Sequence, residues 1–312
     1  MSTLLTTSGA EDLNPLRQTR PRYGEKIIQV ILVAAAALSV LTTFGIVIAV
    51  LVPSLEFFSE IPITEFLFTT TWTPLFANPQ YGVLPLLAGT FVITLIAIVV
   101  AIPLGLGSAI YLSEYASPRA RKFLKPTLEV LAGIPTVVFG FFALDFITQY
   151  VLKPIFPSIE VFNALSAGLV MGVMIIPTIA SLSEDAMSAV PSGLRDGAYA
   201  LGSTKRQTAL RVVVPAALSG IVAAFVLGIS RAIGETMIVT VAAGLQPNLT
   251  LNPLQGMQTM TSYIAAAGSG DVATGSIEYK SIFAVGLLLF IITFVMNMIS
   301  IRLVRKYRQV YQ

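Results

Sequence analysis

Six apolar runs, each long enough to cross a bilayer as a helix, constrain the fold of this chain more than any other feature. A helix needs about 20 mainly apolar residues to span the hydrocarbon core. Polar segments separate the runs, which cover residues 27–52, 82–112, 126–151, 163–182, 215–244 and 281–304. Only 11% of the residues are charged, whereas a soluble domain has about 25%. We therefore predict an all-α, polytopic membrane protein with six transmembrane helices.

The basic residues alternate between the polar segments and predict the orientation of the chain. Four Lys or Arg residues lie in each of the segments 1–26, 113–125, 183–214 and 302–312. Among the other three loops, 53–81 has no Lys or Arg, 152–162 has only Lys153, and 245–280 has only Lys280. Because basic loops stay on the cytoplasmic side, both termini are expected in the cytoplasm. Residues 1–26 are expected to form a flexible cytoplasmic tail, and 27–308 the transmembrane domain.

Two opposite charges interrupt the fifth apolar run. Arg231 and Glu235 are four residues apart, so a continuous helix would place them on one face. A charge inside a membrane is costly, and such a residue is a functional-site hypothesis by default. A guanidinium group also suits phosphate oxygens. Two interpretations stay open: the pair lies on a substrate path, or it is an ion pair that only locks helix packing.

Hydroxyl side chains accompany these charges. Ser230 and Thr236 flank them, and Thr136 lies in the third run. They are candidates for lining the same path, and the alternative is hydrogen bonding between helices.

The residue types that are absent exclude several classes of protein. The sequence has no cysteine and no histidine, which excludes thiolate chemistry, disulfides, imidazole bases and the usual zinc ligands. It has no Gly-Lys-Ser/Thr phosphate loop. The net charge of +3 gives no reason to expect a nucleic-acid partner. We expect no catalytic residues, no metal and no cofactor, and any ATP hydrolysis is expected on another polypeptide.

The longest internal polar segment, 183–214, predicts a compact knob at the membrane surface. Residues 198–201 favour a short helix that Gly202 ends, and residues 204–213 favour a second helix. The alternative is a hairpin that only places basic residues in the cytoplasm.

This segment resembles the "EAA" loop of ABC importer permeases. The family spacing is filled by Asp196, Gly197, Ala198, Gly202, Val212, Val214 and Pro215. Asp replaces the usual Glu, and Gly the first Ala, which weakens any particular role for that carboxylate. The resemblance implies that the knob docks into a groove of a cytoplasmic ATPase and transmits its closing.

Two membrane segments resemble the permeases of the phosphate-specific ABC importer. Residues 230–239 are similar to their fifth span, and residues 132–140 to their third. The continuation Met237-Ile238-Val239 is closer to the PstC type of subunit than to its PstA-type partner. The resemblance implies a type I, MetI-like permease fold in a bacterial inner or plasma membrane.

The same resemblance implies a function and a set of partners. The function is ATP-driven import of inorganic phosphate by alternating access. The partners are a homologous PstA-like permease, two copies of a PstB-like ATPase and an extracytoplasmic PstS-like phosphate-binding protein. A single helix from Pro215 would carry both the knob and Arg231, about 24 Å apart.

Four alternatives stay open. The first is a permease for another oxyanion, such as sulfate or molybdate. The second is the PstA-type subunit of the phosphate importer. The third is an ion-coupled secondary carrier, in which Glu235 would be a proton site, and the fourth is an enzyme of the membrane interface. The knob argues against a carrier, and the missing catalytic groups argue against an enzyme.

Overall fold

The computed structural model describes residues 23–307, and the predictions for residues 1–22 and 308–312 lie outside the described residues. Within 23–307 the regular structure is helical, apart from one isolated β-bridge between Trp72 and Tyr81. The prediction of an all-α protein is therefore confirmed.

The chain divides into two compact units, residues 1–49 and 50–312. Helix α1 (Tyr23–Glu60) runs through the boundary, and its first part is the described portion of the first unit. Because α1 already begins at Tyr23, the last four residues of the expected tail 1–26 are helical. The helix is long and apolar enough to cross a membrane.

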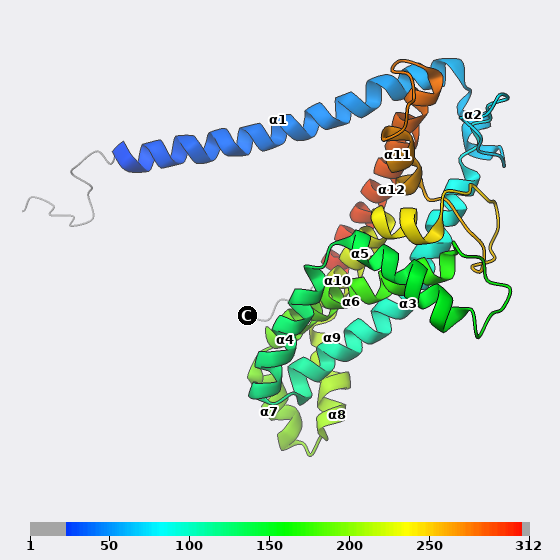
Figure 1. Cartoon of the computed structure of the whole chain (residues 1–312). Coiled ribbons are helices and arrows are strands. Elements are labelled where there is room, and N and C mark those ends of the chain that lie inside the picture. The colour runs from blue at the N-terminus through cyan, green and yellow to red at the C-terminus, as the bar shows by residue number, and fades with distance from the viewer. Residues whose placement is uncertain (1–22, 308–312) are drawn as a thin grey trace, which may run out of the picture. The chain divides into compact units, whose positions relative to one another are not determined.

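The second unit continues with helices of very different length (Figure 1). They are α2 (Ile63–Phe68), α3 (Leu84–Ile110), α4 (Pro118–Ala132), α5 (Thr136–Phe141), α6 (Ala164–Ser188), α7 (Ser192–Ala200), α8 (Lys205–Thr208), α9 (Val214–Ala216), α10 (Leu218–Ile233), α11 (Met260–Gly268) and α12 (Ile277–Tyr307). Wider, π-helical segments extend or join them: η1 (Tyr111–Tyr115), η2 (Phe142–Leu152), η3 (Ala209–Val213) and η4 (Val239–Ala243).

Four helices among the described residues could cross a membrane unbroken, by length and composition. They are α1, α3 with η1, α6 and α12. Two further spans are bent: α4 meets α5–η2 at 86°, and the segment 205–216 meets α10 at 74°. The described part thus holds four spans, or six if each bent pair crosses as one.

The expected third span, 126–151, is not one straight helix, because the sequence Gly133-Ile134-Pro135 breaks it. Helix α4 ends at Ala132 with Gly133 as its C-cap, and α5 begins after Pro135. A proline lacks a backbone N–H and disfavours the helical conformation of the residue before it.

The expected fifth span, 215–244, is also broken. The chain bends at Ala217, α10 ends at Ile233, and the helix resumes only at Met237. The expectation that the knob and Arg231 share one straight helix is therefore wrong.

The core of the second unit lies where α3 packs on α6. A Cβ on Gly168 would lie 2.7 Å from the Cβ of Ile96, and one on Gly172 would lie 2.9 Å from the carbonyl oxygen of Ala97. Both distances are shorter than van der Waals contact, so these two positions need glycine. Small residues let the backbones of membrane helices approach closely, and here they join α3 to α6.

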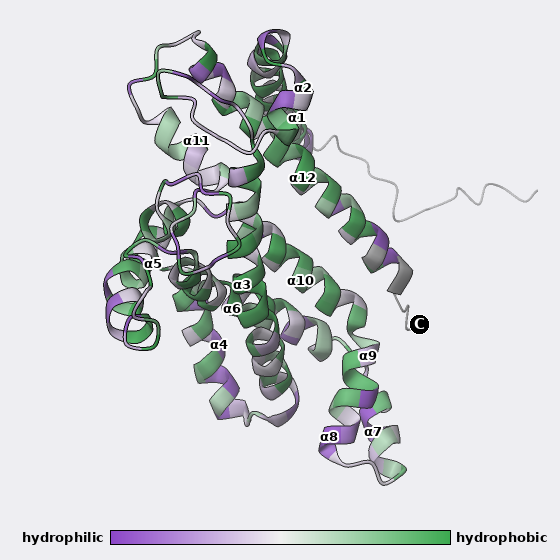
Figure 2. Cartoon of the chain, turned by 90° about the vertical axis from the view of Figure 1, so that its right-hand side faces the viewer, coloured by the Kyte–Doolittle hydropathy of each residue, from purple (hydrophilic) through white to green (hydrophobic). Residues whose placement is uncertain are grey.

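The two ends of this unit differ in composition. At one end, near α2 and α11, buried aromatic rings of Phe57, Phe66, Trp72, Tyr81 and Tyr263 form an apolar cluster. At the other end, α7 and α8 lie side by side beyond the apolar helices, and Figure 2 shows more hydrophilic residues there and on α4. The bundle between the two ends is mainly hydrophobic (Figure 2).

Candidate functional site

Arg231 lies in the last turn of α10, half-buried, and its guanidinium group reaches across to α6. Nη1 donates a hydrogen bond to Thr178 Oγ1 at 2.9 Å, and Nη2 donates to Met174 Sδ at 3.4 Å. A cation near a helix C-terminus is favoured by the helix dipole. Both partners are neutral, so the positive charge of Arg231 is not cancelled by them.

Glu235 is 9% exposed and caps the next helical turn. Its Oε1 accepts hydrogen bonds from the backbone N–H groups of Met237 at 3.0 Å and Ile238 at 3.3 Å. The hydroxyl of Thr261, just after the start of α11, donates to the backbone carbonyl of Glu235 at 2.6 Å. A carboxylate at a helix N-terminus satisfies N–H groups that have no partner in the helix.

These contacts explain why Arg231 and Glu235 do not form the ion pair that their spacing suggests. The spacing rule holds only while a helix continues, and α10 ends between the two residues. Within residues 23–307, no ion pair joins them at 4.0 Å or less. Glu235 is occupied by backbone N–H groups instead.

The three candidate hydroxyls lie at the edges of this region. Ser230 Oγ donates a long hydrogen bond of 3.4 Å to Asn297 Oδ1 on α12. Thr236 Oγ1 donates to the carbonyl of Gly234 at 3.4 Å. Thr136 is the first residue of α5 and is half-buried.

The third and fifth runs meet through α5. Gly140, one turn after Thr136, faces the segment that follows Glu235, because an added Cβ would lie 2.9 Å from Val241 Cβ. The structure therefore brings the two stretches 132–140 and 230–239 together.

Sequence reasoning missed Thr178 and Met174. Thr178 follows Pro177 inside an apolar run, and a hydroxyl beside a proline in such a run was a signal for it. Met174 gave no signal, because a methionine in an apolar helix is usually core.

The predicted knob is present as two short helices, α7 and α8. Gly202 has a φ of +78°, which favours glycine, and the N–H groups of Gly202 and Ser203 close the end of α7. Thr204 begins α8 with a capping box to Gln207. Leu201 at the turn is 89% exposed, so the tip of the knob is an apolar side chain without cover in the described chain.

The residues of the "EAA" pattern divide between the surface of the knob and its base. Asp196, Gly197 and Gly202 are exposed, whereas Ala198 is buried, and the carbonyl of Ala198 accepts from Ser203 N–H. At the base, Val212 and Val214 are half-buried and Pro215 is exposed. The valine between them, Val213, lies in a cluster with Met187 and Ile221.

Charged residues anchor the base of the knob, and sequence reasoning assigned them no role. Arg195 Nη2 lies 3.0 Å from Glu114 Oε1 on η1 and donates to the carbonyl of Met187 at 2.8 Å, while Nη1 donates to Val190 at 2.7 Å. This arginine ties α7 to the ends of α3 and α6.

A second ion cluster joins α4 to α6. The Glu184 side chain is fully buried and accepts from Arg121, from Lys125 at 2.7 Å and from Ser188 at 2.8 Å. Lys125 also pairs with Asp185 at 2.7 Å. In this cluster each cation contacts a carboxylate directly, whereas Arg231 contacts only neutral groups in the described chain.

Comparison with protein families gives one match over most of the chain. Residues 101–309 match the family described as "Binding-protein-dependent transport system inner membrane component". Among similar proteins, "Probable ABC transporter permease protein YqgH" of Bacillus subtilis is 37% identical over 290 residues, which cover 92% of this chain and 93% of that protein. "Phosphate transport system permease protein PstC" of Haemophilus influenzae is 31% identical over 324 residues, with 94% and 98% covered.

Solved structures of other importers share the fold. A bacterial ABC transporter involved in import of the acidic polysaccharide alginate has a TM-score of 0.62 at 15% identity, covering 93% of this chain and 100% of that one. The inward-facing MetNI methionine ABC transporter has a TM-score of 0.54 at 21% identity, covering 73% and 95%. At these identities the likeness concerns the fold alone.

Proposed function

Because the chain belongs to the family of binding-protein-dependent transport system inner membrane components, and is therefore a multi-pass permease subunit of an ABC importer, we propose that it carries inorganic phosphate into the cytoplasm by alternating access. The observation that carries this proposal is the half-buried Arg231, whose partners Thr178 and Met174 are neutral. Similarity to permeases named for phosphate transport supports the same substrate.

Arg231 is the proposed contact for phosphate on the path. Its guanidinium group offers several N–H donors in one plane, which suits two phosphate oxygens at once. The Thr178 hydroxyl accepts from one N–H group and positions the guanidinium group, which has further N–H donors for phosphate. We place Ser230, Thr236 and Thr136 on the same path, where their hydroxyls offer neutral hydrogen bonds.

Glu235 is proposed to limit how tightly phosphate binds. It follows Arg231 by four residues and stays occupied by the N–H groups of Met237 and Ile238. A second anion in the same region repels phosphate, and a site that conducts must also release its ion. A path with Arg231 alone would hold a dianion more strongly.

The knob is proposed to couple the permease to ATP. We infer that the apolar tip at Leu201 and the exposed Asp196 and Gly197 contact a cytoplasmic ATPase of the PstB type, present in two copies. A PstA-like permease completes the pore, and a PstS-like binding protein delivers phosphate from outside. In this arrangement both termini lie in the cytoplasm, as the basic loops predict.

The test is uptake of radiolabelled phosphate by the reconstituted complex, with sulfate as competitor. With Arg231→Gln, we expect uptake to fall about a hundredfold, because two charge-assisted hydrogen bonds of about 1.5 kcal/mol each are lost. Complex assembly and the unfolding temperature should stay unchanged. Normal uptake by the variant would mean that Arg231 does not lie on the substrate path. If sulfate competes as well as unlabelled phosphate does, the substrate would be oxyanions in general rather than phosphate.

A further inference from the structure

Two adjoining cavities lie between α4 and the end of α3, and they differ in chemistry. The first, of about 490 Å³, is lined by Leu112, Ser113, Ala116, Pro118, Arg121, Lys122, Lys125, Pro126 and Glu129. The second, of about 410 Å³, is lined by Pro103, Leu104, Gly107, Ser108, Tyr111, Leu112, Leu124 and Leu128. Leu112 lines both, so a basic cavity lies next to an apolar one.

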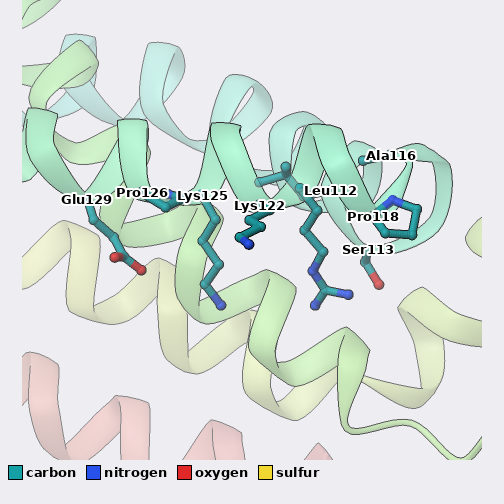
Figure 3. A pocket seen from close by; sticks show the side chains of 9 residues that line it. Leu112, Ser113, Ala116, Pro118, Lys122, Lys125, Pro126 and Glu129 are labelled. Carbon is teal, nitrogen blue, oxygen red and sulfur yellow. The ribbon is translucent and has the colours of Figure 1, made fainter.

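The basic cavity has a cation that the protein leaves available. Figure 3 shows Lys122 and Lys125 along one side of α4, with Glu129 at the far end of the row. Arg121 and Lys125 are held by the buried Glu184 on α6. Lys122 is exposed and has no carboxylate partner within 4.0 Å in the described part of the chain. An anion entering the cavity therefore meets the ammonium group of Lys122, which lacks a carboxylate partner in the described chain, beside two cations that are already paired.

The apolar cavity has room beside Gly107. A Cβ built on Gly107 would meet no heavy atom within 4 Å, so the space next to this helix position is open. Leu104, Leu124 and Leu128 supply hydrocarbon walls. Elsewhere on α4, the side chain of Phe123 is 72% exposed, so this helix also presents an apolar surface.

We propose that an anionic glycerophospholipid binds here, with its headgroup phosphate at Lys122 and an acyl chain in the groove beside Gly107. Basic cavities next to apolar grooves on the cytoplasmic side suit anionic headgroups. Segment 113–125 is one of the four basic segments, and basic segments are expected on the cytoplasmic side. A free phosphate ion would match only the basic cavity and would leave the groove at Gly107 without a role.

The position of this lipid links it to the ion cluster at Glu184. The same helix that lines both cavities carries Arg121 and Lys125, which hold α6 one turn before Met187. Met187 accepts from Arg195 at the base of the knob. The lipid would therefore support the helix that holds this end of α6. This inference does not depend on which substrate the permease carries.

The experiment is native mass spectrometry of the complex of this chain with its partner permease and ATPase. Phosphatidylglycerol and phosphatidylcholine with the same acyl chains are titrated in parallel. We expect Lys122→Gln to lower phosphatidylglycerol retention about fivefold, as for one lysine at an anionic headgroup. Arg119→Gln, on the same helix but outside the cavity lining, is the matched control and should retain the lipid. Gly107→Phe should reduce retention of both lipids, and Gly107→Leu repeats that test with a smaller obstruction.

Three results would overturn the proposal. If Lys122→Gln and Arg119→Gln lose phosphatidylglycerol to the same extent, general surface charge and not the cavity attracts the lipid. If both Gly107 variants retain the lipids unchanged, the groove beside Gly107 does not bind an acyl chain. Displacement of phosphatidylglycerol by excess inorganic phosphate would assign the basic cavity to the free anion.

Discussion

The arginine inside the bundle and the arginines at the knob end have opposite kinds of partner. Arg231 contacts a hydroxyl and a thioether on α6, whereas Arg121 and Arg195 contact the carboxylates of Glu184 and Glu114. All three reach from one helix to another. The pairs at the knob end hold fixed elements together, but Arg231 keeps a charge that a ligand can use.

The difference follows from what surrounds each group. A buried charge needs a partner, and a fully buried carboxylate such as Glu184 is stable only with its cations in contact. Arg231 is half-buried and meets two neutral groups, so much of its stabilisation is left to solvent or to an anion. We expect the contrast to separate residues that hold the fold from those proposed to contact substrate.

The largest effect on stability is expected from Glu184→Gln. It leaves Arg121 and Lys125 without their shared carboxylate, and breaking such a buried pair costs about 3–5 kcal/mol. Both cations are partly exposed, at 39% and 29%, so we expect about 3 kcal/mol, the lower end of that range. The measurement is the thermal unfolding temperature of the purified complex.

Asp185→Asn is the matched control for Glu184→Gln. Its carboxylate pairs with the same Lys125 but is 58% exposed, so its loss should cost less than about 1 kcal/mol. If the two variants unfold at the same temperature, burial does not decide the strength of the cluster, and the comparison with Arg231 loses its basis.

Thr178→Val tests the other side of the comparison with a smaller effect. The change keeps the shape of the side chain and removes the hydroxyl that positions Arg231. A hydrogen bond to a charged group contributes about 1.5 kcal/mol, so uptake at limiting phosphate should fall about tenfold. The control is Thr293→Val on α12, whose hydroxyl donates to the backbone carbonyls of Leu289 and Phe290 on its own helix. Equal uptake by both variants would mean that Thr178 does not position Arg231.

The predictable part of this structure was the part controlled by local sequence. Long apolar runs predicted the helices, and Gly202 with Thr204 predicted the turn and the second helix of the knob, because both depend on neighbouring residues alone. The shared family pattern predicted the MetI-like fold.

The unpredictable part depended on contacts between distant segments. Glu235 was expected beside Arg231, but a helix end at Gly234 turned its carboxylate toward the N–H groups of the next turn. Glu184 looked like one more charge in a polar loop, and only the packing of α4 on α6 buries it. Spacing along a chain cannot show either event, because it assumes that the helix continues and says nothing of its neighbours.

The last prediction concerns the turn of the knob, where no charge is involved. Gly202 has a φ of +78° and no atom within 4 Å of an added Cβ, so Gly202→Ala tests backbone conformation alone. The left-handed conformation costs an alanine about 1–2 kcal/mol. We expect the complex to assemble but to import less phosphate per ATP hydrolysed, measured in proteoliposomes. Gly193→Ala is the control, because Gly193 also has open space but lies within α7, where alanine favours the helix. If both variants couple normally, the left-handed turn is not needed to transmit ATPase closing, and the ion pair between Arg195 and Glu114 becomes the stronger candidate for that link.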